Sequence, residues 1–229
     1  MATGTSDITI IGGGVVGLSI AIGLLQAGRR VTVLDGSDGD FRASQGNFGL
    51  VWLQGKGADF APYAEWSRDA VAAWPGFANM LKNLSGLDLA LDQSGGFEFF
   101  TEATEFEHFK AALKRQQTHL GNKFTHEIMS ADELRRMYPG IGSGVVGATF
   151  CALDGHVNPL RLLRALRSAF AALGGDLVSD ALVTGILASK HGGFDLSLLN
   201  GGRLAAERVV LCAGLGTTQL AAQLGFTTR

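Results

Sequence analysis

The chain has 229 residues, a formal net charge of −2 and a pI near 6.2; 46% of its residues are hydrophobic and 17% are charged. This balance is typical of a globular α/β protein with one large domain or two small ones. The charge provides no basic surface, so we expect no nucleic-acid partner. The opening "MATGTSD" lacks a basic segment followed by an apolar one, and no apolar run reaches about 18 residues. We therefore expect a soluble, cytoplasmic protein without a transmembrane segment.

The first motif lies in "IIGGGVVGLSIAIGLLQAGRRVTVLD", residues 10–35. Gly12, Gly14 and Gly17 match the pattern G-x-G-x-x-G. The isoleucine-rich run 8–11 predicts a buried strand, the apolar spacing that follows predicts a helix ending near Gly28, and residues 31–34 predict a second strand. A glycine-rich turn alone more often indicates a structural loop. In register with a strand, a helix and a second strand, it predicts a dinucleotide site.

Each position of this motif has a physical role. Gly12 allows a sharp turn, Gly14 leaves room for a pyrophosphate against the backbone, and Gly17 allows close helix–strand packing. The amides at the helix N-terminus attract the pyrophosphate. Asp35, at the end of the second strand, can accept hydrogen bonds from a ribose diol.

A polar, glycine-rich segment at residues 36–57 favours a flavin over a nicotinamide. In a nicotinamide-binding domain the second strand usually leads through another helix to a third parallel strand. Here Arg42, Ser44, Gln45 and Asn47 follow instead, in a stretch without helical period. Long irregular segments in compact domains are often functional, and these side chains can bond to phosphate or to the polar edge of a ring. The alternative is an ordinary solvated loop.

Four segments together resemble the D-amino acid oxidase or glycine oxidase type of FAD-dependent oxidoreductase, the DAO family. They are the motif above with "VTVLD", "RASQGNFGLV" at 42–51, "DGHVNPLRLLRAL" at 154–166 and "VVLCAG" at 209–214. Within the family, the chain is most similar to bacterial amine and imino-acid dehydrogenases related to opine oxidase. Asp35 is a departure, since the family usually has Glu there, but the shorter carboxylate can still reach a ribose.

The resemblance implies an α/β, Rossmann-like FAD-binding fold (GR2-type) with an interrupting part of a substrate-domain β-sheet. Residues 1–57 and 151–229 would form the FAD-binding domain, and residues 58–150 part of the substrate domain. Val183 would contact the adenine through its backbone, and Arg42 would lie near the phosphates. The implied FAD-binding residues are Gly12, Gly14, Val15, Val16, Gly17, Asp35, Arg42, Ala43, Ser44, Gln45, Asn47, Gly49, Leu50, Val183, Ala213 and Gly214.

The middle of the chain predicts local elements. Residues 60–84 have helical spacing, interrupted or kinked near Pro75, with Trp66 and Trp74 expected as core anchors. Residues 86–100 alternate like a hairpin. A helix is expected near 103–117, a capping box of Ser130 and Glu133 opens another that Pro139 ends, and residues 145–152 predict a strand.

The last third predicts the return of the nucleotide fold. Asn158 is a good helix cap, and a helix is expected from Pro159, with Arg161, Arg164 and Arg167 on a solvated face. One or two strands are expected at 176–187, a tight hairpin at Asn200 and Gly201, and a buried strand at 208–213. His156 is assigned a structural role, and Cys151 and Cys212 are expected to be buried, reduced thiols.

No carboxylate pair, Ser/His/Asp set or metal-ligand spacing is recognisable, so the catalytic residues stay unknown and no metal site is expected. Hydride transfer from an amine carbon to a flavin needs positioning rather than a nucleophile. The expected function is FAD-dependent oxidation of the CH–NH bond of an amino or imino acid. One alternative is an FAD-binding module or subunit of a multimeric amine dehydrogenase, inactive alone. Another is a flavin hydroxylase, which would carry a Gly-Asp fingerprint in place of "DGHVNP".

The chain stops soon after "VVLCAG", where family members usually continue. We therefore expect a missing C-terminal segment or a partner subunit to complete the enzyme. The arginines of this chain have other expected places, so the cation that binds the substrate carboxylate is expected in that missing part.

Overall fold

The structure is a computed structural model that describes residues 6–36 and 42–227. Residues 1–5 of the opening and 37–41 of the polar segment lie outside the described residues. The chain forms two compact units: unit 1 comprises Met1–Asn47, Met80–Leu89 and Pro159–Arg229, and unit 2 comprises Phe48–Asn79 and Ala90–Asn158. The assignment of 1–57, 151–229 and 58–150 to cofactor and substrate domains stays a prediction.

Unit 1 is built on a parallel four-stranded sheet in the order β12-β1-β2-β8. Its strands are β1 (Ile8–Ile11), β2 (Val31–Leu34), β8 (Asp176–Val178) and β12 (Val209–Leu211). Ile10 and Val33 are fully buried, as strands covered on both faces require. On the side away from β1, β2 pairs with β8, a strand far along the sequence. This pairing confirms a parallel α/β fold interrupted by other elements. The expected burial of the last strand is wrong: β12 is half-buried, because it is an edge strand.

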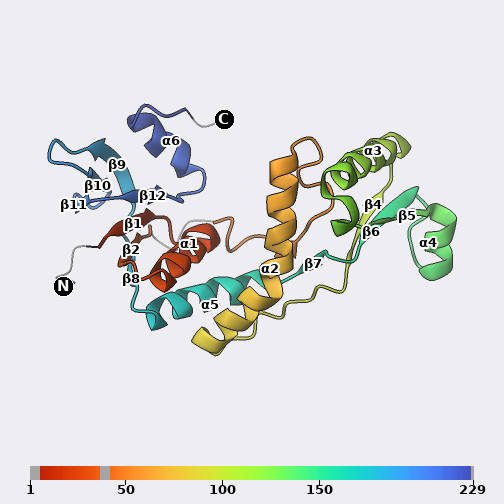
Figure 1. The fold of residues 1–229 in the computed structure, drawn as a ribbon, viewed down its shortest axis with the longest axis horizontal. Coiled ribbons are helices and arrows are strands. Elements are labelled where there is room, and N and C mark those ends of the chain that lie inside the picture. Colours follow the sequence, from red (N-terminus) through yellow and green to blue (C-terminus); the bar gives the residue numbers. More distant parts are fainter. Residues whose placement is uncertain (1–5, 37–41, 228–229) are drawn as a thin grey trace. The chain divides into compact units, whose positions relative to one another are not determined.

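Two helices, α1 (Val15–Gln26) and α5 (Pro159–Ala172), lie side by side next to this sheet (Figure 1). Ala21 of α1 and Ala165 of α5 are fully buried, and such small side chains allow close packing. Gly28 ends α1 as expected: its φ is +74°, and its N–H donates to the Leu25 carbonyl at 2.9 Å.

The other side of the parallel sheet is covered by a second sheet and α6 (Gly216–Gln223) (Figure 1). This antiparallel sheet has the order β11-β10-β9 and consists of β9 (Val183–Ala188), β10 (Phe194–Leu198) and β11 (Arg203–Ala206). The hairpin predicted at Asn200 and Gly201 is confirmed, with a φ of +85° at Gly201. The shared core comprises Ile11, Leu34, Ala181, Val183, Ile186, Leu196, Ala206 and Leu220.

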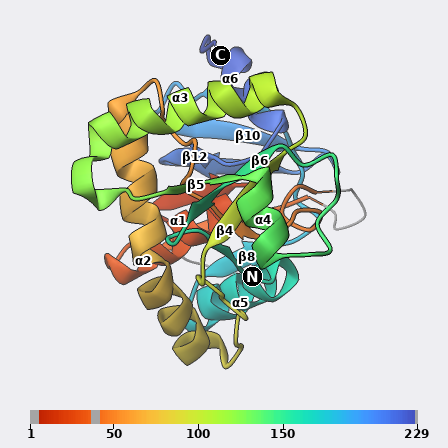
Figure 2. The same ribbon diagram turned by 90° about the vertical axis from the view of Figure 1, so that its right-hand side faces the viewer.

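Unit 2 contains an antiparallel sheet in the order β4-β6-β5. Its elements are β4 (Gly96–Phe100), β5 (Glu127–Ser130), β6 (Gly147–Cys151), α3 (Ala103–Leu120) and the short 3-10 turn η1 (Gly121–Lys123). Helix α3 packs against β4 and β6 (Figure 2). The hairpin expected within 86–100 is wrong. The backbone of β4 pairs instead with β6, a strand distant in sequence that offers a complete five-residue ladder.

Helix α2 (Ala61–Ser85) is continuous through Pro75, so of the expected interruption or kink, the interruption does not occur. Its tryptophans are not the core anchors expected from the sequence. Trp66 is 71% exposed and Trp74 is half-buried, whereas Ala64, Val71 and Leu81 are buried. The prediction from residue size, which put the two tryptophans in the core, therefore gave the wrong buried face of the helix. In the described ranges, no helix combines the length and apolar character that a membrane crossing requires.

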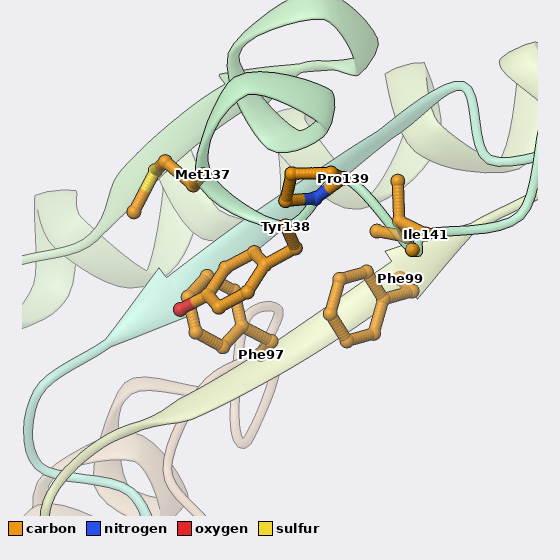
Figure 3. Close-up of a pocket in the computed structure, with 7 residues that line it drawn as sticks. Phe97, Phe99, Met137, Tyr138, Pro139 and Ile141 are labelled. Atoms are coloured by element: carbon orange, nitrogen blue, oxygen red, sulfur yellow. The ribbon is translucent and has the colours of Figure 1, made fainter.

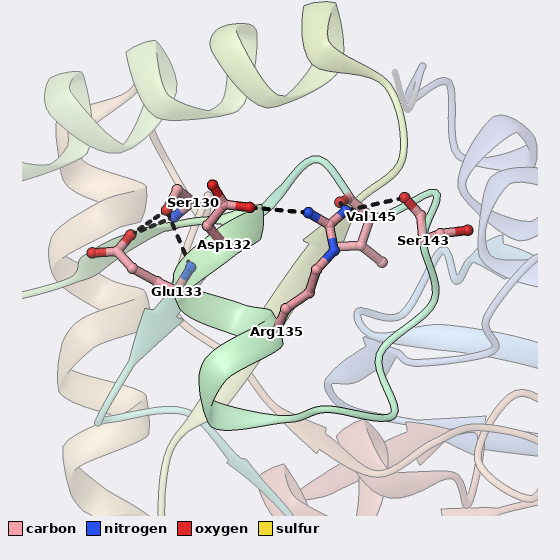
Figure 4. A network of polar contacts seen from close by, with 6 residues as sticks. All are labelled: Ser130, Asp132, Glu133, Arg135, Ser143 and Val145. Atoms are coloured by element: carbon pink, nitrogen blue, oxygen red, sulfur yellow. Dashed lines mark hydrogen bonds and ion pairs between the residues drawn. The ribbon is translucent and has the colours of Figure 1, made fainter.

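Helix α4 (Ala131–Met137) confirms the predicted capping box and the stop before Pro139 (Figure 4). The Glu133 N–H donates to Ser130 Oγ at 3.4 Å, and the Ser130 N–H donates to Glu133 Oε2 at 2.8 Å. The Ser130 hydroxyl, which donates to Glu133 Oε2 at 2.6 Å, and then the Ser130 N–H hold the pKa of Glu133 below its usual value. Arg135 also bonds to Asp132 at 3.2 Å and to the Ser143 carbonyl at 3.2 Å, which fixes the segment after the helix.

Replacing the cap, Ser130→Ala, should destabilise the protein by about 1 kcal/mol, because a helix of two turns loses a satisfied N-terminal amide. Urea unfolding followed by circular dichroism measures the change. Ser168→Ala, at a position inside α5, is the matched control and should change stability by less than about 0.5 kcal/mol. Equal effects of the two variants would contradict the capping role.

Candidate cofactor site

The glycine turn between β1 and α1 is shaped by close backbone contacts. Gly12 has a φ of +111°, and a Cβ there would collide with the Cys212 carbonyl. A Cβ on Gly17 would collide with the Gly12 carbonyl. Gly14 is the N-cap of α1 and supplies no side-chain cap, and Val15 begins the helix, followed by Val16, which is 64% exposed. The turn thus combines the tight geometry and the helix N-terminus that a pyrophosphate site needs.

Asp35 lies at the end of β2 and is only 7% exposed. Its Oδ1 accepts the Gly13 N–H at 3.0 Å, which ties the acid directly to the glycine turn. Its Oδ2 pairs with Arg42 at 2.5 Å and with Arg167 at 3.6 Å. The two arginines compensate the cost of burying the carboxylate. The expected contact of Arg42 with the phosphates stays a prediction.

Arg167 was missed by sequence reasoning, which placed it on a solvated face with Arg161 and Arg164. The other two arginines are exposed, but Arg167 is partly buried and reaches Asp35. A separation of more than a hundred residues hides this ion pair from local patterns. The one sequence feature that could have indicated its burial is its position three residues before the fully buried Phe170, since residues i and i+3 lie on neighbouring parts of a helix face.

The segment 42–47 folds back toward the start of α1. Ser44 Oγ accepts the Val15 N–H at 3.1 Å, so this hydroxyl lies at the helix N-terminus. The Arg42 carbonyl accepts the Gln45 N–H at 2.9 Å, and Asn47 Nδ2 donates to the Ala43 carbonyl at 2.8 Å. The structure therefore brings Ser44 to the glycine turn and closes the segment by local bonds.

The end of β12 meets the same turn. The Cys212 N–H donates to the Ile11 carbonyl at 2.8 Å, and the next residues, Ala213 and Gly214, begin the connection to α6. Gly214 has a φ of +57°, which favours glycine. Val183, in contrast, is 6% exposed, and its side chain belongs to the core, so only its backbone is available to a ligand. Its contact with adenine stays a prediction.

Gly49 and Leu50 belong to unit 2, where β3 (Leu50–Val51) pairs with β7 (Gly155–His156). The Val157 N–H donates to the Gly49 carbonyl at 2.8 Å, so "DGHVNP" holds the end of "RASQGNFGLV" in place. Leu50 is 57% exposed and the neighbouring Phe48 is 89% exposed. Apolar side chains that face away from the core next to a fixed backbone are available for a planar, partly apolar ligand.

Asp154, in the same motif, is a second buried acid that sequence reasoning passed over. It is fully buried, and its Oδ1 accepts the Leu53 N–H at 2.5 Å. Burial raises its pKa to about 6. Burial first, and the negative charge of Asp154 second, raise the pKa of Cys151 to about 11. Cys151 is thus a buried, unreactive thiol, as expected, while Cys212 is only partly buried; both are free.

Two hollows lie within unit 2. The larger, of about 490 Å³, is lined by aromatic and apolar groups from β4 and the segment after α4 (Figure 3). Phe97 and Tyr138 meet there edge to face at 5.8 Å. The smaller, of about 240 Å³, includes Leu50 and Lys56 among its walls, with Trp52, Tyr63, Trp66 and Trp74. In the described part of the chain, no group of three or more His, Cys, Asp or Glu residues is placed to hold a metal.

The parallel sheet, the glycine turn and the buried acid define a dinucleotide-binding α/β protein. A family model described as FAD dependent oxidoreductase (DAO) matches residues 7–229. The chain belongs to this family, which is FAD-dependent, so the sequence-based choice of flavin over nicotinamide is confirmed. A tight glycine turn at a helix N-terminus and an acid at the end of β2 are groups of the kind that a pyrophosphate and a ribose require, and their contacts with FAD stay predictions.

Known relatives are longer than this chain. It is 40% identical to one of the subunits of opine oxidase from Agrobacterium tumefaciens (strain Ach5), over 96% of this chain and 59% of the relative. It is 26% identical to glycine oxidase from Bacillus licheniformis, over 97% of this chain and 58% of the relative. The crystal structure of glycine oxidase from Geobacillus kaustophilus matches with a TM-score of 0.82 and 27% identity, over 98% of this chain and 60% of that one.

Gly14→Val should abolish FAD binding, because its side chain enters the space beside Ser44 Oγ, which lies 2.8 Å from an ideal Cβ. Titration of the apoprotein with FAD, followed by flavin fluorescence, should show no saturation. Gly23→Ala, in the same helix, is the matched control: a Cβ there meets no atom within 4 Å, so affinity should be unchanged. Saturable binding by Gly14→Val would show that the pyrophosphate lies elsewhere.

Asp35→Ala should weaken FAD binding by roughly ten- to hundredfold without abolishing it. Charge-assisted hydrogen bonds to a ribose contribute about 1.5 to 3 kcal/mol, whereas the glycine turn remains open to the pyrophosphate. The same titration measures the dissociation constant. Asp195→Ala, at an exposed acid of β10, should leave it unchanged. An effect of Asp35→Ala as complete as that of Gly14→Val would refute the separate roles of the two residues.

Proposed function

We propose that this chain supplies the FAD-binding part of an oxidoreductase that oxidises the CH–NH bond of an amino or imino acid. The observation that carries the proposal is the family match over residues 7–229 together with the buried Asp35 tied to the glycine turn. The names of two relatives, an opine oxidase and a glycine oxidase, support an amino compound as the substrate class. The substrate within that class is left to experiment.

Bound FAD supplies the hydride acceptor. The residues of this chain bind and orient it. The helix N-terminus at Gly14 and the Ser44 hydroxyl would hold the pyrophosphate, and Asp35 would hold the ribose. Gly49 and Leu50, two further residues of the predicted set, would lie against the ring system. Orientation of the reacting carbon next to the cofactor is itself a major part of catalysis, since a well-aligned reaction needs far less entropy loss at the transition state.

A second candidate function is an FAD-binding module that needs another polypeptide for chemistry. Two observations favour it: the chain spans about 59% of the opine oxidase relatives it matches, and both of these relatives are named as subunits. The described cations near the site are already engaged, because Arg42 and Arg167 both pair with Asp35. Lys56, in the wall of the smaller hollow beside Leu50, is the one lysine or arginine among the described residues that line either hollow.

The purified chain should carry FAD noncovalently. Acid denaturation should release a yellow cofactor that elutes with authentic FAD, because buried Cys151 and the partly buried Cys212 both have raised pKa values that disfavour the thiolate needed for attachment. The supernatant and the precipitate are both assayed for flavin. Flavin retained on the precipitated chain, or release of NAD, would overturn this expectation.

Anaerobic mixing with glycine, sarcosine, hydroxyproline, D-amino acids and opines tests the reaction. We expect no fast loss of the oxidised flavin band with residues 1–229 alone, and loss once the remaining part of a relative is supplied as a separate polypeptide. A panel of 2-hydroxy acids is the control for CH–OH oxidation. Reduction by the chain alone would remove the need for a partner, and Lys56→Met would then test Lys56 as the carboxylate anchor. Reduction by hydroxy acids only would refute the proposed substrate class.

A further inference from the structure

The structure assigns to Asp154 the role of a positioning residue that fixes the segment Gly49–Leu53. This inference rests on the proposed function in one respect, which is that Gly49 and Leu50 contact the cofactor. We call the bond from the Leu53 N–H to Asp154 Oδ1 the clamp. It lies within unit 2, and its geometry does not depend on any ligand.

The segment is held at both ends by the stretch 154–157. At one end the Val157 N–H donates to the Gly49 carbonyl at 2.8 Å, and at the other the Leu53 N–H donates to Asp154 Oδ1 at 2.5 Å. Between these bonds, Leu50 pairs with His156 and Val51 with Gly155. A two-residue ladder is too short to be stable alone, so the segment needs further anchors. The Leu53 carbonyl accepts a hydrogen bond from Gln116 Nε2 at 2.8 Å, and Asp154 supplies the bond to the Leu53 N–H.

Contacts from neighbouring segments fix the position of Asp154. Its backbone carbonyl accepts the Gly95 N–H at 3.0 Å, and its Cβ lies 3.0 Å from the position of an ideal Cβ on Gly96. A Cβ on Gly155 would collide with the Asp92 carbonyl. Three segments therefore enclose the acid, and its Oδ2 has no hydrogen-bond partner among the described residues. A fully buried acid with one unsatisfied oxygen is costly, and such groups persist where their contact is required.

The ionisation state of Asp154 should change the strength of this clamp. The groups that face it are the Cys151 thiol of β6 and the neutral amide of Gln54; His156 of β7 and Asp92 are exposed. Burial outweighs the hydrogen bonds that favour the carboxylate, and the pKa is therefore raised from 3.8 to about 6. A raised pKa means that the closed form binds the proton more tightly than an opened form does. Protonation therefore stabilises the closed form, in which the acid is buried, although the Leu53 N–H bond itself favours the carboxylate; this stabilisation is lost as the pH rises through about 6.

Amide hydrogen exchange of the apoprotein, measured at Leu53 between pH 5 and 7.5, tests the clamp. After correction for intrinsic exchange, the protection factor should be about tenfold higher at pH 5 than at pH 7.5. Asp154→Asn keeps a neutral acceptor, so protection should persist but lose its pH dependence. Asp154→Ala removes the acceptor, and protection should fall by about tenfold or more at every pH. His156→Gln should leave the pH dependence intact, which excludes the neighbouring imidazole as its source.

FAD affinity of the same variants tests the link to the cofactor. Asp154→Ala should raise the FAD dissociation constant about tenfold, and Asp154→Asn should restore it to within about threefold of the wild type. Unchanged Leu53 exchange in Asp154→Ala, or a pH dependence retained in Asp154→Asn, would overturn the clamp. Altered exchange with unchanged FAD affinity would overturn the role toward the cofactor. A wild-type chain that binds no FAD but shows the expected exchange would refute the proposed function while supporting the clamp.

Discussion

The buried carboxylate of Asp35 is the interaction that links the separate parts of the candidate nucleotide site. Its Oδ1 accepts the Gly13 N–H and its Oδ2 pairs with Arg42 and Arg167, so one side chain joins the glycine turn, the segment after β2 and helix α5. Its backbone N–H and carbonyl are also bonded, to Val178 and Ala181. A charge in this position is tolerated only because it is paired and hydrogen-bonded. The same requirement positions the elements that would hold FAD.

Unit 2 has its own buried acid, and the comparison between the two explains their different chemistry. Asp35 has two arginines beside it, so its oxygens are paired with cations as well as with the Gly13 N–H. Asp154 is enclosed by Cys151, Gln54 and backbone, and burial raises its pKa to about 6. The first acid is therefore held by ion pairs at the glycine turn. The second is suited to holding a backbone segment, with a strength that depends on its proton.

Much of the candidate site was predictable because its signals are local. Gly12, Gly14, Gly17 and Asp35 follow from a turn, a helix start and a strand end, and the structure brings them together with Ser44 and the end of β12. Arg167 and Asp154 were not predictable in these roles. Each acts on a partner about a hundred or more residues away, and neither helical spacing nor residue type records such a contact.

By itself, the sequence determined the strand–helix–strand start, the capping box at Ser130, the Asn200–Gly201 hairpin and the family, because turn chemistry and periodicity act between neighbours. Tertiary structure alone decided that β4 pairs with β6 instead of forming a hairpin, and that Trp66 is exposed while smaller residues of α2 are buried. The physical reason is the same in both cases. Strand pairing and burial depend on competition among distant segments for hydrogen bonds and apolar surface. A local pattern determines the secondary structure and the apolar face of a segment, but not the segment against which it pairs or packs.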